Sequence, residues 1–105
     1  RELSEAELSW LPGYENSTPV RVGNGAANQL QLDVYGETCE VLHLGRQAGL
    51  DAHSPSAELQ LRLVEWLEDH WREPDEGIWE VRGPRRHFVH SKVMAWVAVD
   101  RTVKL

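Results

Sequence analysis

The residues whose types could support catalysis are concentrated in the acidic segment 74–83. This segment holds three carboxylates within six positions, Asp75, Glu76 and Glu80, and Trp79 stands directly before the last of them. A carboxyl group beside a buried indole has a raised pKa, which makes it a proton donor near neutral pH. The segment is therefore interpreted as a site rather than a connector. The alternative interpretation is a surface turn whose tryptophan fills a neighbouring groove.

The composition indicates one globular domain. The chain has 105 residues, of which 41% are hydrophobic and 27% charged, the balance of an ordinary soluble protein. The net charge of -6 opposes nucleic-acid binding, because phosphate contacts require a basic surface. Nucleic acid is therefore not an expected partner.

Cysteine usage and hydropathy bear on the compartment. The single cysteine, Cys39, cannot form an internal disulfide, so an oxidising compartment is not needed. No apolar run approaches the length of a membrane span, and the N-terminus lacks a signal-peptide pattern. A cytoplasmic protein without a membrane partner is expected. Because the chain starts at Arg1 and ends at Leu105 within an apolar periodic pattern, it is expected to be a piece of a longer protein.

Helical periodicity covers most of the chain. Apolar residues recur at steps of three, four and seven, which predicts helices over residues 26–50, 55–72 and 89–105. A turn-rich stretch, 1–25, precedes them, and the acidic loop, 73–88, separates the last two. Three helices with short links predict an all-α fold with an αα-hairpin at its centre.

The segments of unusual composition are expected to meet at one end of this bundle. If the first two helices are antiparallel, the Gly-rich segment 12–25 lies beside the acidic segment 74–83, together with the start of the third helix. The short link 51–54 then lies at the opposite end. A site built from both segments would require this convergence.

Several separate motifs carry a resemblance to a known family. They are LPGY at 11–14, PVRVGNGAA at 19–27, QLQLDVYGE at 29–37, WREPDEGIWEVRG at 71–83, HF at 87–88 and SKVMAW at 91–96. In this order they resemble bacterial glycoside hydrolase family 15, which contains glucoamylases, glucodextranases and bacterial trehalases. The resemblance implies a partial (α/α)6 toroid, with this chain as a central segment of a single catalytic domain.

The resemblance also implies roles for two residues of the acidic segment. In this family the glutamate directly after the tryptophan of the acidic loop is the general acid, which is Glu80 here. The family inverts at the anomeric carbon, so one acid protonates the glycosidic oxygen while a second carboxylate activates water. Trp79 would be an apolar wall for the acid and a platform near the sugar. The general base lies downstream of Leu105, so the isolated chain is expected to be inactive.

The chain departs from the fungal glucoamylases at two positions. Those enzymes carry a second glutamate directly after the general acid and an aspartate three residues before it, where this chain has Val81 and Gly77. Starch-type specificity is therefore not expected to carry over. The expected substrate is an α-glucoside such as trehalose or a short oligosaccharide, with no cofactor. The alternative function is a non-catalytic helical module that binds carbohydrate or a partner.

Other polar residues near the expected site have two interpretations each. Arg82, with Arg85 and Arg86, could contact sugar hydroxyls or a phosphate, or could neutralise neighbouring acids. Arg21 and Asn24 could hydrogen-bond a glucosyl ring, although Asn24 also suits an N-cap of the first helix.

The remaining candidates divide in the same way. His87 could be a sugar ligand or a structural helix-end histidine. Asp75 and Glu76 could raise the pKa of Glu80 by like-charge repulsion, or could be solvated acids at a helix end, which is the favoured interpretation. No metal site is expected, because His43 and His70 lack metal-ligand spacing with the other histidines.

Overall fold

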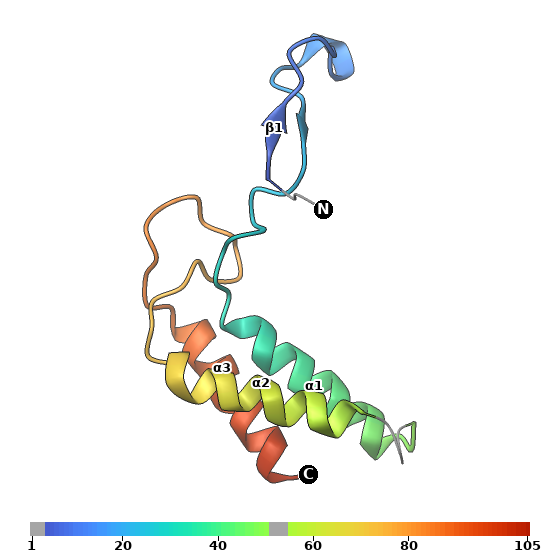
Figure 1. The fold of residues 1–105 in the computed structure, drawn as a ribbon, viewed down its shortest axis with the longest axis vertical. Helices are drawn as coiled ribbons and strands as arrows, with labels where there is room; N and C mark the ends of the chain where they lie inside the picture. The colour runs from blue at the N-terminus through green and yellow to red at the C-terminus, as the bar shows by residue number, and fades with distance from the viewer. Residues whose placement is uncertain (1–3, 51–54) are drawn as a thin grey trace.

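The computed structural model describes residues 4–50 and 55–105. Its elements, in chain order, are β1 (Ala6–Glu7), the 3-10 turn η1 (Tyr14–Asn16), β2 (Arg21–Val22), α1 (Asp33–Gln47), α2 (Ser56–His70) and α3 (Val89–Val103). The predicted all-α class is confirmed: three helices form the body of the chain, and the strands are a short antiparallel pair in a projecting hairpin (Figure 1). The predicted link 51–54 lies outside the described residues. Within the described residues, no helix is long and apolar enough to span a bilayer.

The helices alternate in direction. In Figure 1, α1 and α3 both run away from the loops, while α2 runs back toward them. The most extensive helix contact joins α1 to α3. There Gly36 lets the two backbones touch, because a Cβ on it would lie 2.7 Å from the carbonyl carbon of Met94. The start of α1 is therefore held directly beside the start of α3.

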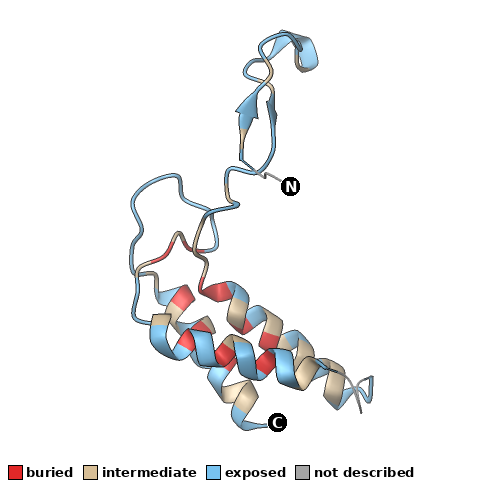
Figure 2. Cartoon of the chain, in the orientation of Figure 1, coloured by how far each residue is buried: buried red, intermediate tan, exposed pale blue. Residues whose placement is uncertain are grey.

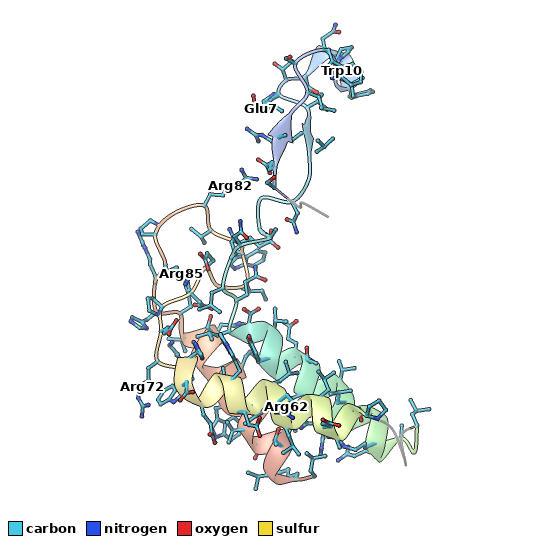
Figure 3. All side chains as sticks on the ribbon, viewed as in Figure 1. Glu7, Trp10, Arg62, Arg72, Arg82 and Arg85 are labelled. Atoms are coloured by element: carbon cyan, nitrogen blue, oxygen red, sulfur yellow. The ribbon has the colours of Figure 1, made fainter. Side chains whose placement is uncertain are left out.

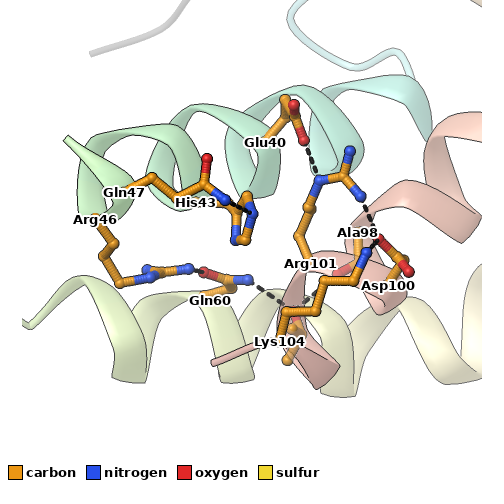
Figure 4. A network of polar contacts seen from close by, with 10 residues as sticks. Glu40, His43, Arg46, Gln47, Gln60, Ala98, Asp100, Arg101 and Lys104 are labelled. Carbon is orange, nitrogen blue, oxygen red and sulfur yellow. Dashed lines mark hydrogen bonds and ion pairs between the residues drawn. The ribbon is translucent and has the colours of Figure 1, made fainter.

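A small core and a polar network hold the three helices together. The core consists of six buried apolar residues: Leu32, Cys39, Val64, Leu67, Ala95 and Ala98 (Figure 2). Buried Gln60 of α2 accepts a hydrogen bond from Arg46 and donates one of 2.9 Å to Thr102, so it links all three helices (Figure 4). Arg101 pairs with Glu40 across the α1–α3 contact. These contacts fix the helix register at a distance from the loops.

Much apolar surface stays uncovered by the described residues. On α3, Trp96 is 62% exposed and Val93 50% exposed. The chain measures 52 × 31 × 24 Å, with a Cα radius of gyration of 17.7 Å. A compact domain of this length has a radius of about 13 Å. The difference arises because the β1–β2 hairpin projects beyond the helices (Figure 1).

The first helix starts later than predicted. It begins at Asp33 rather than near residue 26. Asn24 does not cap it, because the Asn24 side chain accepts a 2.9 Å hydrogen bond from Ala26 N within a local turn. After that turn, the N–H groups of Leu30 and Leu32 are bound by carboxylates of the acidic loop, which replaces helical hydrogen bonding. Tertiary contacts therefore override the helical periodicity of this segment.

Candidate active site

The site loop, residues 73–88, connects α2 to α3 and is closed at its base (Figure 3). Its two arms are joined where Asp75 N donates to Arg86 O and Arg86 N donates to Asp75 O, both at 2.9 Å. This isolated antiparallel bridge fixes the start and the end of the loop against each other. Lys92 of α3 adds a second tie, because its Nζ donates to the carbonyl of Trp71 at 2.7 Å and to that of Glu73.

Two successive carboxylates anchor the base of the loop to the segment before α1. Asp75 is fully buried, and its Oδ2 accepts a hydrogen bond of 3.0 Å from Leu32 N. Glu76 Oε2 accepts one of 2.6 Å from Leu30 N, and Glu76 N donates to Leu30 O at 2.9 Å. Arg85 pairs with the other oxygen of Glu76 at 3.0 Å. The favoured interpretation of Asp75 and Glu76 as solvated acids is wrong, because both are bound within the protein.

The tip of the loop is a tight turn that presents Glu80. Val81 N donates to Glu76 O at 3.3 Å, and Glu80 N donates to Gly77 O at 3.2 Å. This is the hydrogen-bond pattern of a Schellman motif, in which the penultimate residue adopts the left-handed conformation. Glu80 accordingly has φ +50°, which costs about 1 kcal/mol for a residue with a side chain. Gly77, the buried residue at which the base passes into this turn, has φ +69° and packs on the Phe88 ring.

The apolar pair before Glu80 is not buried by the described residues. Trp79 is 85% exposed and Ile78 is 43% exposed. The expected buried indole is therefore wrong for this chain, because the base of the loop packs against the protein and its tip does not. Outside the turn, the Gln29 side chain donates a hydrogen bond of 3.4 Å to the Glu80 carbonyl. The turn leaves the Glu80 side chain open to solvent.

The predicted meeting of segments 12–25 and 74–83 is confirmed at the end of the first segment, where a Cβ on Gly25 would lie 3.2 Å from the Arg82 guanidinium. An ion-pair cluster at this place also includes Glu5, which lies outside the predicted segment. Arg82 binds both carboxylate oxygens of Glu5 at 3.2 and 3.0 Å (Figure 3). Arg21 lies 3.4 Å from the same carboxylate and 3.3 Å from Glu7. The hydrogen bond from Arg82 lowers the pKa of Glu5, and Glu5, more than Glu80, raises the pKa of Arg82. In this structure Arg82 therefore neutralises a nearby acid.

The other candidate residues lie at different edges of the site. Asn24 is exposed in the turn that leads from the hairpin. His87 is also exposed and lines an apolar hollow of about 380 Å³ at the start of α3, with Val93 and Trp96. Neither residue hydrogen-bonds the loop tip within the described part of the chain. No three His, Cys, Asp or Glu side chains in that part are grouped as metal ligands would be.

Sequence reasoning missed three residues that hold the site. Glu5 is separated from Arg82 by 77 positions, so no local pattern could have paired them. Lys92 is partly buried, and this desolvation lowers its pKa against the opposing charges of Asp75 and Glu73. Gln29 lies in the motif at 29–37, to which no role at the site was assigned.

Comparisons with known proteins bear on this arrangement. The family model described as "Glycosyl hydrolases family 15" matches residues 1–105. A trehalase of Mycobacterium tuberculosis is 49% identical over 105 residues, which is 100% of this chain and 15% of the relative. A trehalase of Mycolicibacterium smegmatis is 50% identical over 108 residues, or 100% of this chain and 16% of the relative.

A more distant relative, "Trehalase 1" of Sulfolobus acidocaldarius, is 41% identical over 103 residues, which is 96% of this chain and 18% of the relative. No solved structure matches the chain. The chain thus spans between 15% and 18% of the length of these three relatives. The match over its whole length shows that the chain belongs to glycosyl hydrolases family 15, a family of glycosidases.

Proposed function

We propose that this chain supplies the general acid, Glu80, of an inverting hydrolase that cleaves trehalose. The observation that carries the proposal is the placement of Glu80. It sits at the exposed end of a turn, in a left-handed conformation, on a loop whose base is held by buried hydrogen bonds. Strained backbone at an exposed acid, supported by a rigid base, is typical of functional positions. The relatives described as trehalases supply the substrate.

The reaction follows from the chemistry of a carboxylic acid beside a glycosidic bond. Glu80 donates its proton to the glycosidic oxygen as the bond from that oxygen to the anomeric carbon breaks. A second carboxylate, outside the described residues, removes a proton from water, whose oxygen attacks the opposite face of the sugar. The leaving sugar carries the proton from Glu80, and the attacked sugar keeps the second proton of the water. The second carboxylate then releases the proton it removed to solvent, from which Glu80 is protonated again, and the configuration at the attacked carbon is inverted.

Neighbouring residues have supporting roles in this proposal. The exposed face of Trp79 provides an apolar platform for a sugar ring and, once a sugar covers it, a less hydrated setting for the acid. Arg82 and Arg21, held together by Glu5, present N–H groups to sugar hydroxyls at the hairpin side of the loop. Asn24 and His87 would contact the substrate at the edges. Gly77 and Val81 favour a small α-glucoside over starch.

A graft tests the proposal directly. The 105-residue chain replaces the aligned segment of the M. smegmatis trehalase, with which it is 50% identical. The graft is expected to hydrolyse trehalose, and Glu80→Gln is expected to lower kcat by roughly 10²–10⁴-fold, the contribution of general acid catalysis. Glu15→Gln is the matched control, because Glu15 is also an exposed glutamate with a left-handed backbone, at φ +51°.

Two outcomes would contradict the proposal. A folded graft whose activity is unchanged by Glu80→Gln would exclude Glu80 as the general acid. Glu80-dependent hydrolysis by the 105 residues alone would show that no second carboxylate from elsewhere is needed. Sugar binding by the chain without any activity of the graft would favour the alternative, a non-catalytic carbohydrate-binding module.

A further inference from the structure

We infer that Asp75 is a positioning residue for Glu80, an inference that rests on the function proposed above. Asp75 is the only carboxylate of the described loop residues that is fully buried, and it stands five positions before Glu80. An ionisable side chain is rarely buried completely unless its bonds have a specific use. The use indicated here is to join three separate segments at one point.

Three segments meet on Asp75. Its backbone N–H and carbonyl both bond Arg86, which ties the outgoing arm of the site loop to the returning arm at 2.9 Å. Its Oδ2 accepts a hydrogen bond of 3.0 Å from the N–H of Leu32, which is the residue directly before α1. This N–H has no acceptor within α1, and a carboxylate is favoured at that helix terminus. Asp75 therefore fixes the loop to the frame made by α1 and α3.

The position of Asp75 is transmitted to Glu80 through the adjoining backbone. Glu76, the next residue, pairs with Leu30, and its carbonyl accepts the N–H of Val81. The carbonyl of Gly77 then accepts the N–H of Glu80. Beyond this turn, the described tie to the backbone of Glu80 is the long contact from Gln29, at 3.4 Å. A shift at Asp75 would therefore carry the turn and the proposed acid with it.

Two substrates with different leaving groups can distinguish a positioning role of Asp75 from a purely structural role. Trehalose loses a sugar alkoxide, which requires protonation by a general acid. α-Glucosyl fluoride loses fluoride, which leaves with little protonation. A displaced general acid slows the first reaction selectively, whereas a lower amount of folded enzyme slows both reactions equally.

The experiment compares the two substrates in the graft. Asp75→Ala removes the acceptor for Leu32 N, and we expect kcat on trehalose to fall by ~100-fold, because misplacement by about 1 Å has this effect. On α-glucosyl fluoride the fall should stay below about threefold, because little proton donation is needed there. Asp75→Asn keeps an oxygen acceptor at the same reach, so trehalose turnover should recover to within about tenfold of the unsubstituted graft.

A further variant covers the case in which Asp75→Ala does not fold. Asp75→Glu keeps the charge but moves the acceptor by one methylene, so the same selective loss on trehalose is expected. The double variant Asp75→Ala/Glu80→Gln should be no slower on trehalose than Glu80→Gln alone, because the positioning residue acts through the acid.

The outcomes distinguish this inference from the proposed function. If Glu80→Gln itself shows no preference for the fluoride, the proposed function fails, and the inference fails with it. If Glu80→Gln is selective but the Asp75 variants lose both activities equally, or lose neither, only the inference is overturned. Failure of Asp75→Asn to recover more activity than Asp75→Ala would also overturn it, because the hydrogen-bond acceptor would then not be the feature that matters.

Discussion

The base and the tip of the site loop are built in opposite ways. At the base, Asp75 is fully buried and Gly77 packs on an aromatic ring. Neighbouring carbonyls, N–H groups and carboxylates there are bonded to the segment before α1 or to the returning arm. At the tip, Trp79 is 85% exposed and Glu80 is open to solvent. The difference shows that the described residues fix where the proposed acid stands. These residues do not bury its side chain.

The largest expected effect comes from disrupting the contact between α1 and α3, which supports the base of the site loop. Gly36→Ala would place a Cβ 2.7 Å from the Met94 carbonyl carbon, which forces α1 away from α3. We expect a loss of ~3 kcal/mol in the free energy of unfolding. Gly45→Ala, in the same helix, is the control, because its Cβ meets nothing within 4 Å and should stabilise the chain by up to ~1 kcal/mol.

Urea denaturation followed by circular dichroism measures both changes, at a concentration at which light scattering shows a monomer. Equal midpoints for the two alanine variants would contradict the close packing of α1 on α3.

A smaller effect is expected from a change within the base itself. Gly77→Ala adds a Cβ 2.8 Å from the Phe88 ring at a residue with φ +69°, and should destabilise the chain by ~2 kcal/mol. Gly83→Ala, past the tip, meets its nearest atom at 3.7 Å and should change stability by less than ~0.5 kcal/mol. The same denaturation experiment compares them. If the two variants are equally stable, the contrast between base and tip is wrong.

The smallest expected effect concerns the ion pair that joins the tip to the hairpin. The pKa of Glu5 is lowered from its ordinary value of 4.5, chiefly by the hydrogen bond from Arg82. Because the pKa of Glu5 is lower in the folded than in the unfolded state, ionised Glu5 stabilises the fold fully above pH 4.5. This stabilisation is lost as the pH falls through the pKa of Glu5 in the folded state. Glu5→Gln should therefore lower the unfolding midpoint slightly at about pH 6 and not at about pH 3.

Arg82→Gln should remove the same pH-dependent difference, and the double variant should lose no more than either single variant. Because the pair is exposed, high salt should shrink the effect. A difference that grows as the pH falls would contradict the assigned sign.

Local sequence patterns predicted the helices well where packing follows periodicity. The helices around residues 56–70 and 89–103 appear within one or two residues of their expected bounds. The first of them buries apolar Val64 and Leu67, whereas the second buries the small residues Ser91, Ala95 and Ala98 and leaves most of its larger apolar residues exposed.

The start of α1 could not be predicted, since Leu30 has helical spacing with Ala27 and Val34, but the N–H groups of Leu30 and Leu32 bond to carboxylates more than 40 positions away. The site itself was predicted as the acidic segment 74–83 and as the place where this segment meets segment 12–25.

The environment of each acid was harder to predict than its place. Asp75 and Glu80 lie in one acidic run, and sequence chemistry assigned burial to the neighbourhood of Glu80 and solvent to Asp75. The structure reverses the two, because the donors that bury Asp75 belong to a distant segment and to Arg86. Burial of a polar side chain depends on such long-range partners, which hydropathy along the chain does not encode.

The left-handed backbone of Glu80 has a consequence for how this position can change over evolutionary time. Glycine would fit the turn best, so Glu80→Gly should relieve the strain while deleting the carboxyl group. If Glu80 is the general acid proposed above, variants at this position trade function for stability, and selection for the acid opposes drift toward the more stable residue. A copy released from that selection is expected to lose its carboxylate here early, through residues such as glycine and asparagine that tolerate this conformation.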